Sequence, residues 1–192
     1  LDQGIDGSGQ EQGLEAMRRA LTPPLLDTPP TANPPGNQGL LRAGSRLLVI
    51  VLSDEDDCSV PHPEALAITP TCGNAGCETD ADCQGEGNYC VGTASPPQSG
   101  RICSLNLCET TQGRAKLVPV SEYVAFLRGL DDGTGRGRKR EVFLAVIGSV
   151  DESLAPARCV SESDEAYGVA TRYAEAVRAM GDNGYLDSIC RA

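Results

Sequence analysis

Two short apolar runs stand out from the polar background of this chain. Residues 47–52 are six consecutive apolar side chains, Leu-Leu-Val-Ile-Val-Leu, and residues 141–147, Glu-Val-Phe-Leu-Ala-Val-Ile, form a second run. Short runs rich in β-branched residues are typical of strands that are buried on both faces of a parallel sheet. We therefore predict two buried strands.

Apolar residues repeat with a helical period in three other segments. The first has Leu14, Met17 and Leu21 on one face, after a capping box from Ser8 to Glu11. The other two stripes are Tyr123, Val124, Leu127 and Leu130 behind a cap at Ser121, and Ala166, Ala170, Tyr173, Val177 and Met180 behind a start at 161–164. Gly181 is expected to end the third helix, and residues 185–190 to add a short edge strand.

Strands that alternate with helices predict right-handed βαβ crossovers and an α/β fold with a parallel sheet. Residues 59–115 interrupt this order and show little periodicity. We assign residues 1–58 and 116–192 to one α/β domain, and residues 59–115 to a cysteine-rich insertion in the loop after the first strand. An insertion of this size has too small a core to be stable without covalent bridges.

Nine cysteines indicate an oxidising compartment. Six of them lie within 37 residues of the insertion, at Cys72, Cys77, Cys83, Cys90, Cys103 and Cys108. This density is typical of a disulfide framework in a secreted or cell-surface protein. Zinc is the alternative, but the single histidine, His62, lies outside the cluster. We predict three bridges among the six and one from Cys159 to Cys190, which leaves Cys58 without a partner in the chain.

The charge balance excludes some classes of partner. The 192 residues contain 16 basic and 27 acidic side chains, a net charge of −11. Nucleic acid and anionic membranes select for basic surfaces, so neither is expected as a partner. No segment approaches the roughly 20 apolar residues of a membrane span.

The end of the first strand carries the densest group of acids. Ser53 is followed by Asp54, Glu55, Asp56 and Asp57. In open α/β sheets ligands bind beyond the carboxyl ends of the strands, and carboxylate oxygens are the ligands that hard cations take. The group therefore indicates either a cation or ligand site or a solvated acidic loop that only ends the strand.

Five separate motifs, taken together in order, resemble a known family. They are residues 7–16 (GSGQEQGLEA), 37–42 (NQGLLR), 49–59 (VIVLSDEDDCS), 172–173 (RY) and 188–190 (SIC). Apart from the six-cysteine insertion, the chain resembles bacterial secreted proteins with a von Willebrand factor type A (vWA) domain. The resemblance implies a partial doubly wound, Rossmann-like parallel sheet with a disulfide-rich loop insertion.

The same resemblance implies a metal-ion-dependent adhesion site. In the family this site takes a D-x-S-x-S motif after the first strand, a Thr from a second loop and an Asp after the fourth strand. By position, Asp54 matches that Asp and Ser8 stands where the Thr would be. Magnesium or calcium would then bind Asp54 and Ser8, with Asp56 and Asp57 as ligand-binding neighbours. Ser8 fits a plain helix cap equally well, and no D-x-S-x-S occurs in the sequence.

The family orders its strands 3-2-1-4-5-6. This chain supplies equivalents of strands 4 and 5, and residues 185–190 are a candidate for strand 6. One side of the strand at 47–52 is then unpaired, which is an edge liability. We expect the chain to be the C-terminal portion of a larger domain that needs the missing N-terminal half or a partner chain.

Three functions are compatible with these observations. The first hypothesis is a non-enzymatic extracellular binding or adhesion module of vWA type, with a protein or cell-surface ligand. The second is a cysteine-rich interaction or inhibitor module, residues 72–108, on a structural scaffold. The third is a metal-dependent hydrolase that uses the acids at 54–57; against it, His62 has no evident nucleophile or orienting partner in the sequence.

Overall fold

The computed structural model describes residues 11–61, 82, 88–93, 100–105, 108, 110–157 and 168–190, and so does not describe Ser8, Cys72, Cys77, Cys83 or Cys159. In chain order its elements are α1 (Gly13–Ala20), η1 (Leu25–Asp27), β1 (Leu47–Leu52), β2 (Asn88–Thr93), β3 (Gly100–Leu105), α2 (Thr111–Arg114), α3 (Val120–Gly129), β4 (Val142–Gly148), α4 (Thr171–Met180), η5 (Gly181–Asn183) and β5 (Gly184–Ser188). Both apolar runs form strands, β1 and β4, within one residue of the predicted ends.

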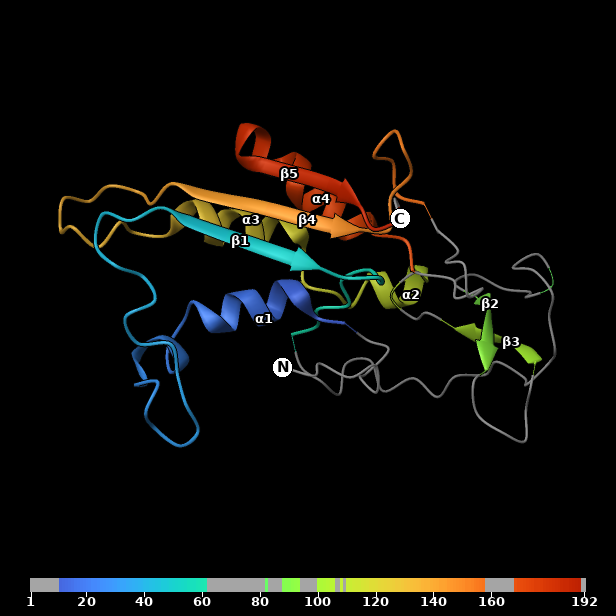
Figure 1. Ribbon diagram of the computed structural model, residues 1–192, viewed down its shortest axis with the longest axis horizontal. Helices are drawn as coiled ribbons and strands as arrows, with labels where there is room; N and C mark the ends of the chain where they lie inside the picture. Colours follow the sequence, from blue (N-terminus) through green and yellow to red (C-terminus); the bar gives the residue numbers. More distant parts are fainter. Residues whose placement is uncertain are drawn as a thin grey trace.

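The strands β1, β4 and β5 form a parallel sheet in that spatial order (Figure 1). β1 pairs with β4 from Leu47 opposite Val142, and β4 pairs with β5 from Leu144 opposite Gly184. Parallel strands that alternate with helices confirm the predicted α/β class. Among the described strands β4 is central and β1 is an edge strand, so one side of residues 47–52 is unpaired there, as expected for this chain. The central position that the family's strand order gives to residues 47–52 is not found in the described part of the chain.

Three helices cover one face of this sheet. α4 packs on β4 and β5, α3 packs on α4, and α1 packs on α3. On this face Val142, Leu144 and Val146 of β4 are buried in one core with Tyr123 of α3 and Tyr173 of α4. The helical stripes predicted from the sequence therefore face the sheet, as the apolar faces of amphipathic helices do.

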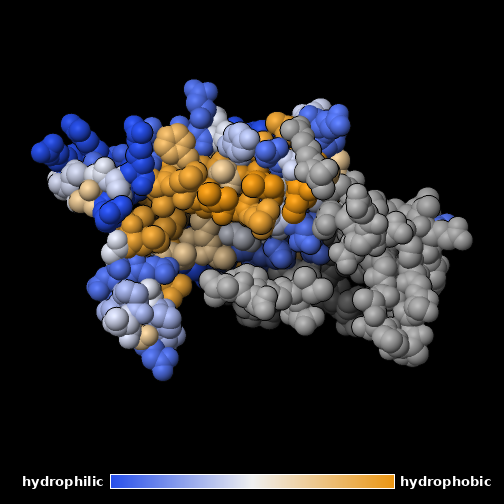
Figure 2. Space-filling view, in the orientation of Figure 1, coloured by the Kyte–Doolittle hydropathy of each residue, from blue (hydrophilic) through white to orange (hydrophobic). Residues whose placement is uncertain are grey.

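The opposite face of the sheet is open. Leu48, Ile50 and Leu52 of β1 are 59, 63 and 68% exposed, and Tyr185 of β5 is 60% exposed. Figure 2 shows a continuous hydrophobic band over the strands on this side. The prediction of burial on both faces is wrong for β1, because its even-numbered side chains are exposed while α3 and α4 lie on the other face of the sheet (Figure 1).

All three helices begin at positions other than those predicted; α4 begins at Thr171, after the non-helical residues 168–170, and not at 161–164. α1 begins at Gly13 and receives no cap from the side chain of its neighbour Gln12, so the helix does not begin at a capping box from Ser8. α3 begins at Val120, directly after Pro119, and Ser121 is inside its first turn. The end of α4 matches the prediction, since Gly181 follows it with a φ of 62°.

A second, antiparallel sheet lies within the predicted insertion. β2 and β3 pair with each other and with no strand of the parallel sheet, and Cys90 is directly opposite Cys103 (Figure 1). This hairpin was not predicted, because residues 59–115 show little periodicity. The domain boundaries at 59 and 115 stay predictions. None of the helices in the described ranges has the length and apolar content to cross a membrane.

Candidate functional site

The acidic loop after β1 connects the strand to two helices. Asp57 is fully buried and its carboxylate accepts hydrogen bonds from the Leu14 N–H (2.9 Å) and the Ser59 hydroxyl (2.6 Å). Its second oxygen accepts from Nε (3.1 Å) and Nη2 (3.0 Å) of Arg172, a side chain with 11% exposure. One carboxylate therefore joins the start of α1, the start of α4 and its own loop.

The first turn of α1 is capped from a distant part of the chain. Besides the bond from Leu14 to Asp57, the Glu15 N–H donates to the Ser59 hydroxyl at 2.9 Å. The first N–H groups of a helix have no partner within the helix, and the helix dipole favours a negative charge beside them. Asp57 and Ser59 meet both needs, 43 and 44 residues along the chain from the groups they cap.

Asp56 does the same for α4. Its Oδ1 accepts from the Arg172 N–H at 2.8 Å and from the Asp57 N–H at 2.9 Å, and the residue is 3% exposed. Burial raises the pKa of Asp56 to about 7, although the two N–H donors oppose the rise. The Asp56 carboxyl therefore changes its protonation state near neutral pH while it holds the start of a helix.

These contacts place the predicted site residues on two sides of the loop. Asp54 follows β1, as predicted, and its side chain is exposed. Asp56 and Asp57 point inward, and their oxygens are engaged by helix N–H groups and Arg172. Ser8, the second predicted metal ligand, lies outside the described residues. Within the described ranges, no three His, Cys, Asp or Glu side chains come together as a metal site, and the magnesium or calcium site stays a prediction.

The cysteine after the acids has a partner. Cys58 forms a disulfide with Cys108, with a Cα–Cα distance of 5.4 Å. The predictions that Cys58 is unpaired and that Cys108 bonds within the insertion are therefore wrong. Both residues are buried with Val60 and Leu117 in a small apolar cluster where the two ends of the insertion meet. Cys190 is also disulfide-bonded, while Cys159, its predicted partner, lies outside the described residues.

A buried acidic side chain fixes α1 against α3. Glu15 is 7% exposed and accepts from the Tyr123 hydroxyl at 3.1 Å. Arg18 and Arg19 of the same helix form ion pairs with it at 2.6 and 2.9 Å. The Arg18 guanidinium also lies 5.1 Å from the centre of the Tyr123 ring, within range of a cation–π contact. These contacts hold α1 against α3.

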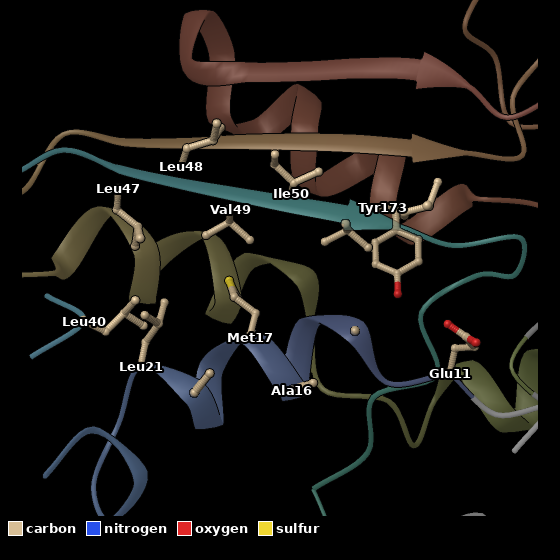
Figure 3. A pocket seen from close by; sticks show the side chains of 14 residues that line it. Glu11, Ala16, Met17, Leu21, Leu40, Leu47, Leu48, Val49, Ile50 and Tyr173 are labelled. Carbon is tan, nitrogen blue, oxygen red and sulfur yellow. The ribbon is translucent and has the colours of Figure 1, made fainter. Parts of the chain in front are cut away.

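A groove of about 460 Å³ lies between α1 and the edge strand β1. Figure 3 shows Met17 of α1 and Leu21, the residue after this helix, on one side and Val49 of β1 on the other. Leu40, 53% exposed, stands at one end. The long walls of the groove are thus apolar. Among the described residues, no other helix or strand covers the space between α1 and β1.

The other end of the groove is polar. The Tyr173 hydroxyl points into the groove near Glu11 (Figure 3). Tyr173 is fully buried, and its hydroxyl has no hydrogen-bond partner among the described residues. Burial, and next the charge of Asp57, raise the pKa of this phenol above its ordinary value, so it stays protonated. The Glu11 carboxylate, which accepts from the Ser53 hydroxyl at 3.0 Å, also lines the groove.

The residues that form this surface were assigned to the core by sequence reasoning. Leu48, Ile50 and Leu52 belong to a run that is apolar on both faces, and such a run alone cannot show that one face lacks a cover. Tyr173 appeared in the sequence as one member of a helical stripe. The surroundings of its hydroxyl depend on the position of α1, which no local pattern contains.

Comparisons of the chain with protein-family models, with curated proteins and with solved structures found no match.

Proposed function

We propose that this chain is a non-enzymatic extracytoplasmic binding module that holds a protein or cell-surface ligand on the open face and edge of its sheet. The observation that carries the proposal is the row formed by Leu48, Ile50 and Leu52, which is more than half exposed at each position. Contiguous exposed apolar surface of this kind marks interaction sites in soluble proteins. A catalytic role has less support, because Asp56 and Asp57 are engaged in capping helices.

The disulfide between Cys58 and Cys108 supports the extracytoplasmic part of the proposal. Structural disulfides persist in oxidising compartments and are rare in the cytosol. A secreted or cell-surface location follows as part of the same proposal, together with the vWA kinship suggested by the order of the sequence motifs.

The vWA kinship adds a metal-assisted form of this function. Asp54 is exposed directly after the carboxyl end of β1, where a carboxylate can take a magnesium or calcium ion. Calorimetric titration of the chain with MgCl₂ and CaCl₂, beside the variant Asp54→Asn, tests this form. Heat of binding in the parent that is lost in the variant supports it, and equal traces contradict it.

Site-specific photo-crosslinking tests the binding function itself. A benzoylphenylalanine at position 50 lies on the open face, and one at position 122, exposed on α3, is the matched control. In intact source cells we expect crosslinks to another protein from position 50 and not from position 122. Addition of excess unlabelled chain should suppress them. Equal yields from both positions, or none from position 50, contradict the proposal.

A second candidate is an interaction module in the cysteine-rich insertion. The observation in its favour is the β2–β3 hairpin, whose strands pair separately from the parallel sheet. Replacement of residues 72–103 by a short Gly-Ser linker removes this hairpin and keeps Cys58 and Cys108. Crosslinking from position 50 should survive this change, whereas a ligand of the insertion should be lost.

A further inference from the structure

Among the described strands β1 pairs with β4 alone, so its outer side presents a hydrogen-bonding edge without a partner there. The N–H groups of Leu47 and Ser53 donate to Glu141 and Ile147, at 3.0 and 3.1 Å, along the β4 side. Alternate residues of a strand face the same neighbour in a parallel ladder. The N–H and C=O groups of the even-numbered residues, 48 to 52, therefore point away from β4, where no described strand pairs with β1.

Residues 47–52 carry none of the sequence features that prevent an edge strand from pairing with a strand of another chain. Proteins protect exposed edges with charged residues, prolines or bulges, or cover them with other elements. β1 is Leu-Leu-Val-Ile-Val-Leu, and its six residues pair with β4 in an unbroken register. Three of the six side chains are more than half exposed. An edge of this composition is suited to pairing with another strand.

The groove beside β1 fits an extended chain better than a helix. Only a strand matches an edge whose N–H and C=O groups alternate along its length. The space, about 460 Å³, runs along all six residues of β1 and is bounded by Met17 of α1 and by Leu21 (Figure 3). A six-residue strand is about 20 Å long, the length of β1 itself, and lies about 4.8 Å from its neighbour.

The polar end of the groove selects the chemistry of the incoming strand. Glu11 and the Tyr173 hydroxyl, without a partner among the described residues, are beside the carboxyl end of β1 (Figure 3). The whole chain has a net charge of −11, so a cationic partner is favoured and a second copy of this chain is repelled. A lysine or arginine on the strand meets the Glu11 carboxylate, and a backbone carbonyl accepts from Tyr173.

We propose that β1 binds one extended strand of a protein partner, apolar along its length and basic at the end that lies beside Glu11. This inference rests on the proposed function, because it names the mode and the chemistry of binding at the same face. The partner strand completes the ladder on the outer side of β1, and its apolar side chains cover the groove between β1 and α1.

The probe is the peptide acetyl-Lys-Val-Ile-Val-Thr-Val-Lys-amide, whose two lysines serve either strand direction. Two control peptides carry N-methyl groups on one or the other alternate set of amides. We expect one control to lose binding at least tenfold in fluorescence anisotropy and the other to bind like the parent, because only one set faces β1. A peptide with glutamates in place of the lysines should bind at least tenfold more weakly.

Amide hydrogen exchange shows where on the protein the peptide binds. In ¹⁵N NMR of the full chain, the amides of Leu48, Ile50 and Leu52 should exchange at least tenfold more slowly with the peptide present. Equal binding by both methylated controls, or protection elsewhere without protection of these three amides, overturns the proposal. The same protection without peptide, rising with protein concentration, identifies a second copy as the occupant and also overturns it.

A pair of proline variants distinguishes a loss of strand addition at β1 from a loss of folding. The Ile50 N–H faces the open edge, so Ile50→Pro should keep the far-UV spectrum and lose peptide binding at least tenfold. Val51→Pro removes a β1–β4 hydrogen bond and should unfold the sheet. Crosslinking from position 50 without peptide binding leaves the proposed function standing and overturns strand addition. Absence of both overturns the two together.

Discussion

Asp57 is bound by groups from three separate parts of the chain. It accepts from Leu14 of α1, from Ser59 of its own loop and from Arg172 of α4. The side chain is fully buried, so its charge is compensated by these contacts and not by water. The residue acts as a structural junction at the position where the sequence suggested a ligand site.

Asp57→Asn should therefore lower the stability of the fold. The change leaves the Arg172 guanidinium, 11% exposed, without its ion pair, and breaking a buried pair on one side costs about 3–5 kcal/mol. Asp54→Asn is the matched control, since that side chain is exposed and should change the free energy of unfolding by less than about 0.5 kcal/mol. Urea unfolding at pH 7 measures both, and equal losses contradict this role.

Asp56 should make the stability of the protein depend on pH. Its folded-state pKa of about 7 lies above the ordinary 3.8, so between these values the folded state binds more protons than the unfolded state. The free energy of unfolding should then fall as the pH rises from about 4 to about 7, by up to about 4 kcal/mol. Asp56→Asn keeps the acceptor for the Arg172 N–H and should flatten this slope.

Thermal unfolding at several pH values compares the parent with Asp56→Asn. The variant should be at least as stable as the parent at pH 8, where the parent carries a buried charge. Parallel stability curves for the two proteins between pH 4 and 7 contradict the assignment of the slope to Asp56.

At the scale of the elements, the sequence predicted which segments are helices and strands better than where helices begin. β1 was predicted to its ends because its apolar run is local. The starts of α1 and α4 are set by Asp57, Ser59 and Asp56, which are distant in the sequence from the helices they cap. A local motif such as the Ser8 capping box cannot represent such a contact, and so it gave the wrong start for α1.

Gly13 fixes the approach of α1 to α4. A Cβ at this position would lie 2.2 Å from the Tyr173 hydroxyl oxygen, and the Tyr173 ring is fully buried. Gly13→Ala should therefore cost about 1–3 kcal/mol through overpacking, although alanine favours a helix by about 1 kcal/mol over glycine. Gly129→Ala in α3 is the control, because no atom lies within 4 Å of its Cβ position.

Chemical denaturation distinguishes the two glycine variants. Gly129→Ala should match or exceed the parent by up to about 1 kcal/mol, while Gly13→Ala falls below it. A stabilised Gly13→Ala would mean that α1 lies farther from Tyr173 than the distance of 2.2 Å between a Cβ at position 13 and the Tyr173 hydroxyl oxygen implies.

At the scale of the whole molecule, one disulfide closes the insertion onto the α/β domain. Cys58 and Cys108 are 50 residues apart and are joined next to the acidic loop. The number and spacing of the cysteines could not predict this pairing, because six clustered cysteines suggested bridges among themselves. The feature of the sequence that favours this pairing is the position of Cys58 and Cys108 near the two ends of the insertion. The contact that decides the pairing is the small cluster with Val60 and Leu117.

Removal of this bridge should destabilise the protein without unfolding the parallel sheet. Closing a loop of this length constrains the unfolded chain by about 4 kcal/mol in the chain-entropy model. The double variant Cys58→Ala and Cys108→Ala should lose stability of that order, and peptide mapping of the parent under non-reducing conditions should recover the linked pair. A map that joins Cys108 to another cysteine contradicts the bridge.

The open sheet face determines how the molecule behaves without a partner. Leu48, Ile50 and Leu52 remain more than half exposed, and each large apolar side chain left in water forgoes roughly 1.5–3 kcal/mol. For three side chains the sum is about 5–9 kcal/mol, comparable with the whole stability of a domain, about 5–15 kcal/mol. The isolated chain should therefore be marginally stable.

Threonine substitution separates exposure from packing on the same strand. Leu48→Thr, Ile50→Thr and Leu52→Thr together keep strand propensity, and should raise solubility with a stability loss below about 1 kcal/mol, because these side chains contact solvent. Val49→Thr with Val51→Thr is the control, since both valines pack against the core, and should cost more because each introduces a hydroxyl there. Sedimentation velocity and thermal unfolding measure the two sets. A larger stability loss in the triple variant than in the control would mean that the face at 48, 50 and 52 is already covered within the molecule.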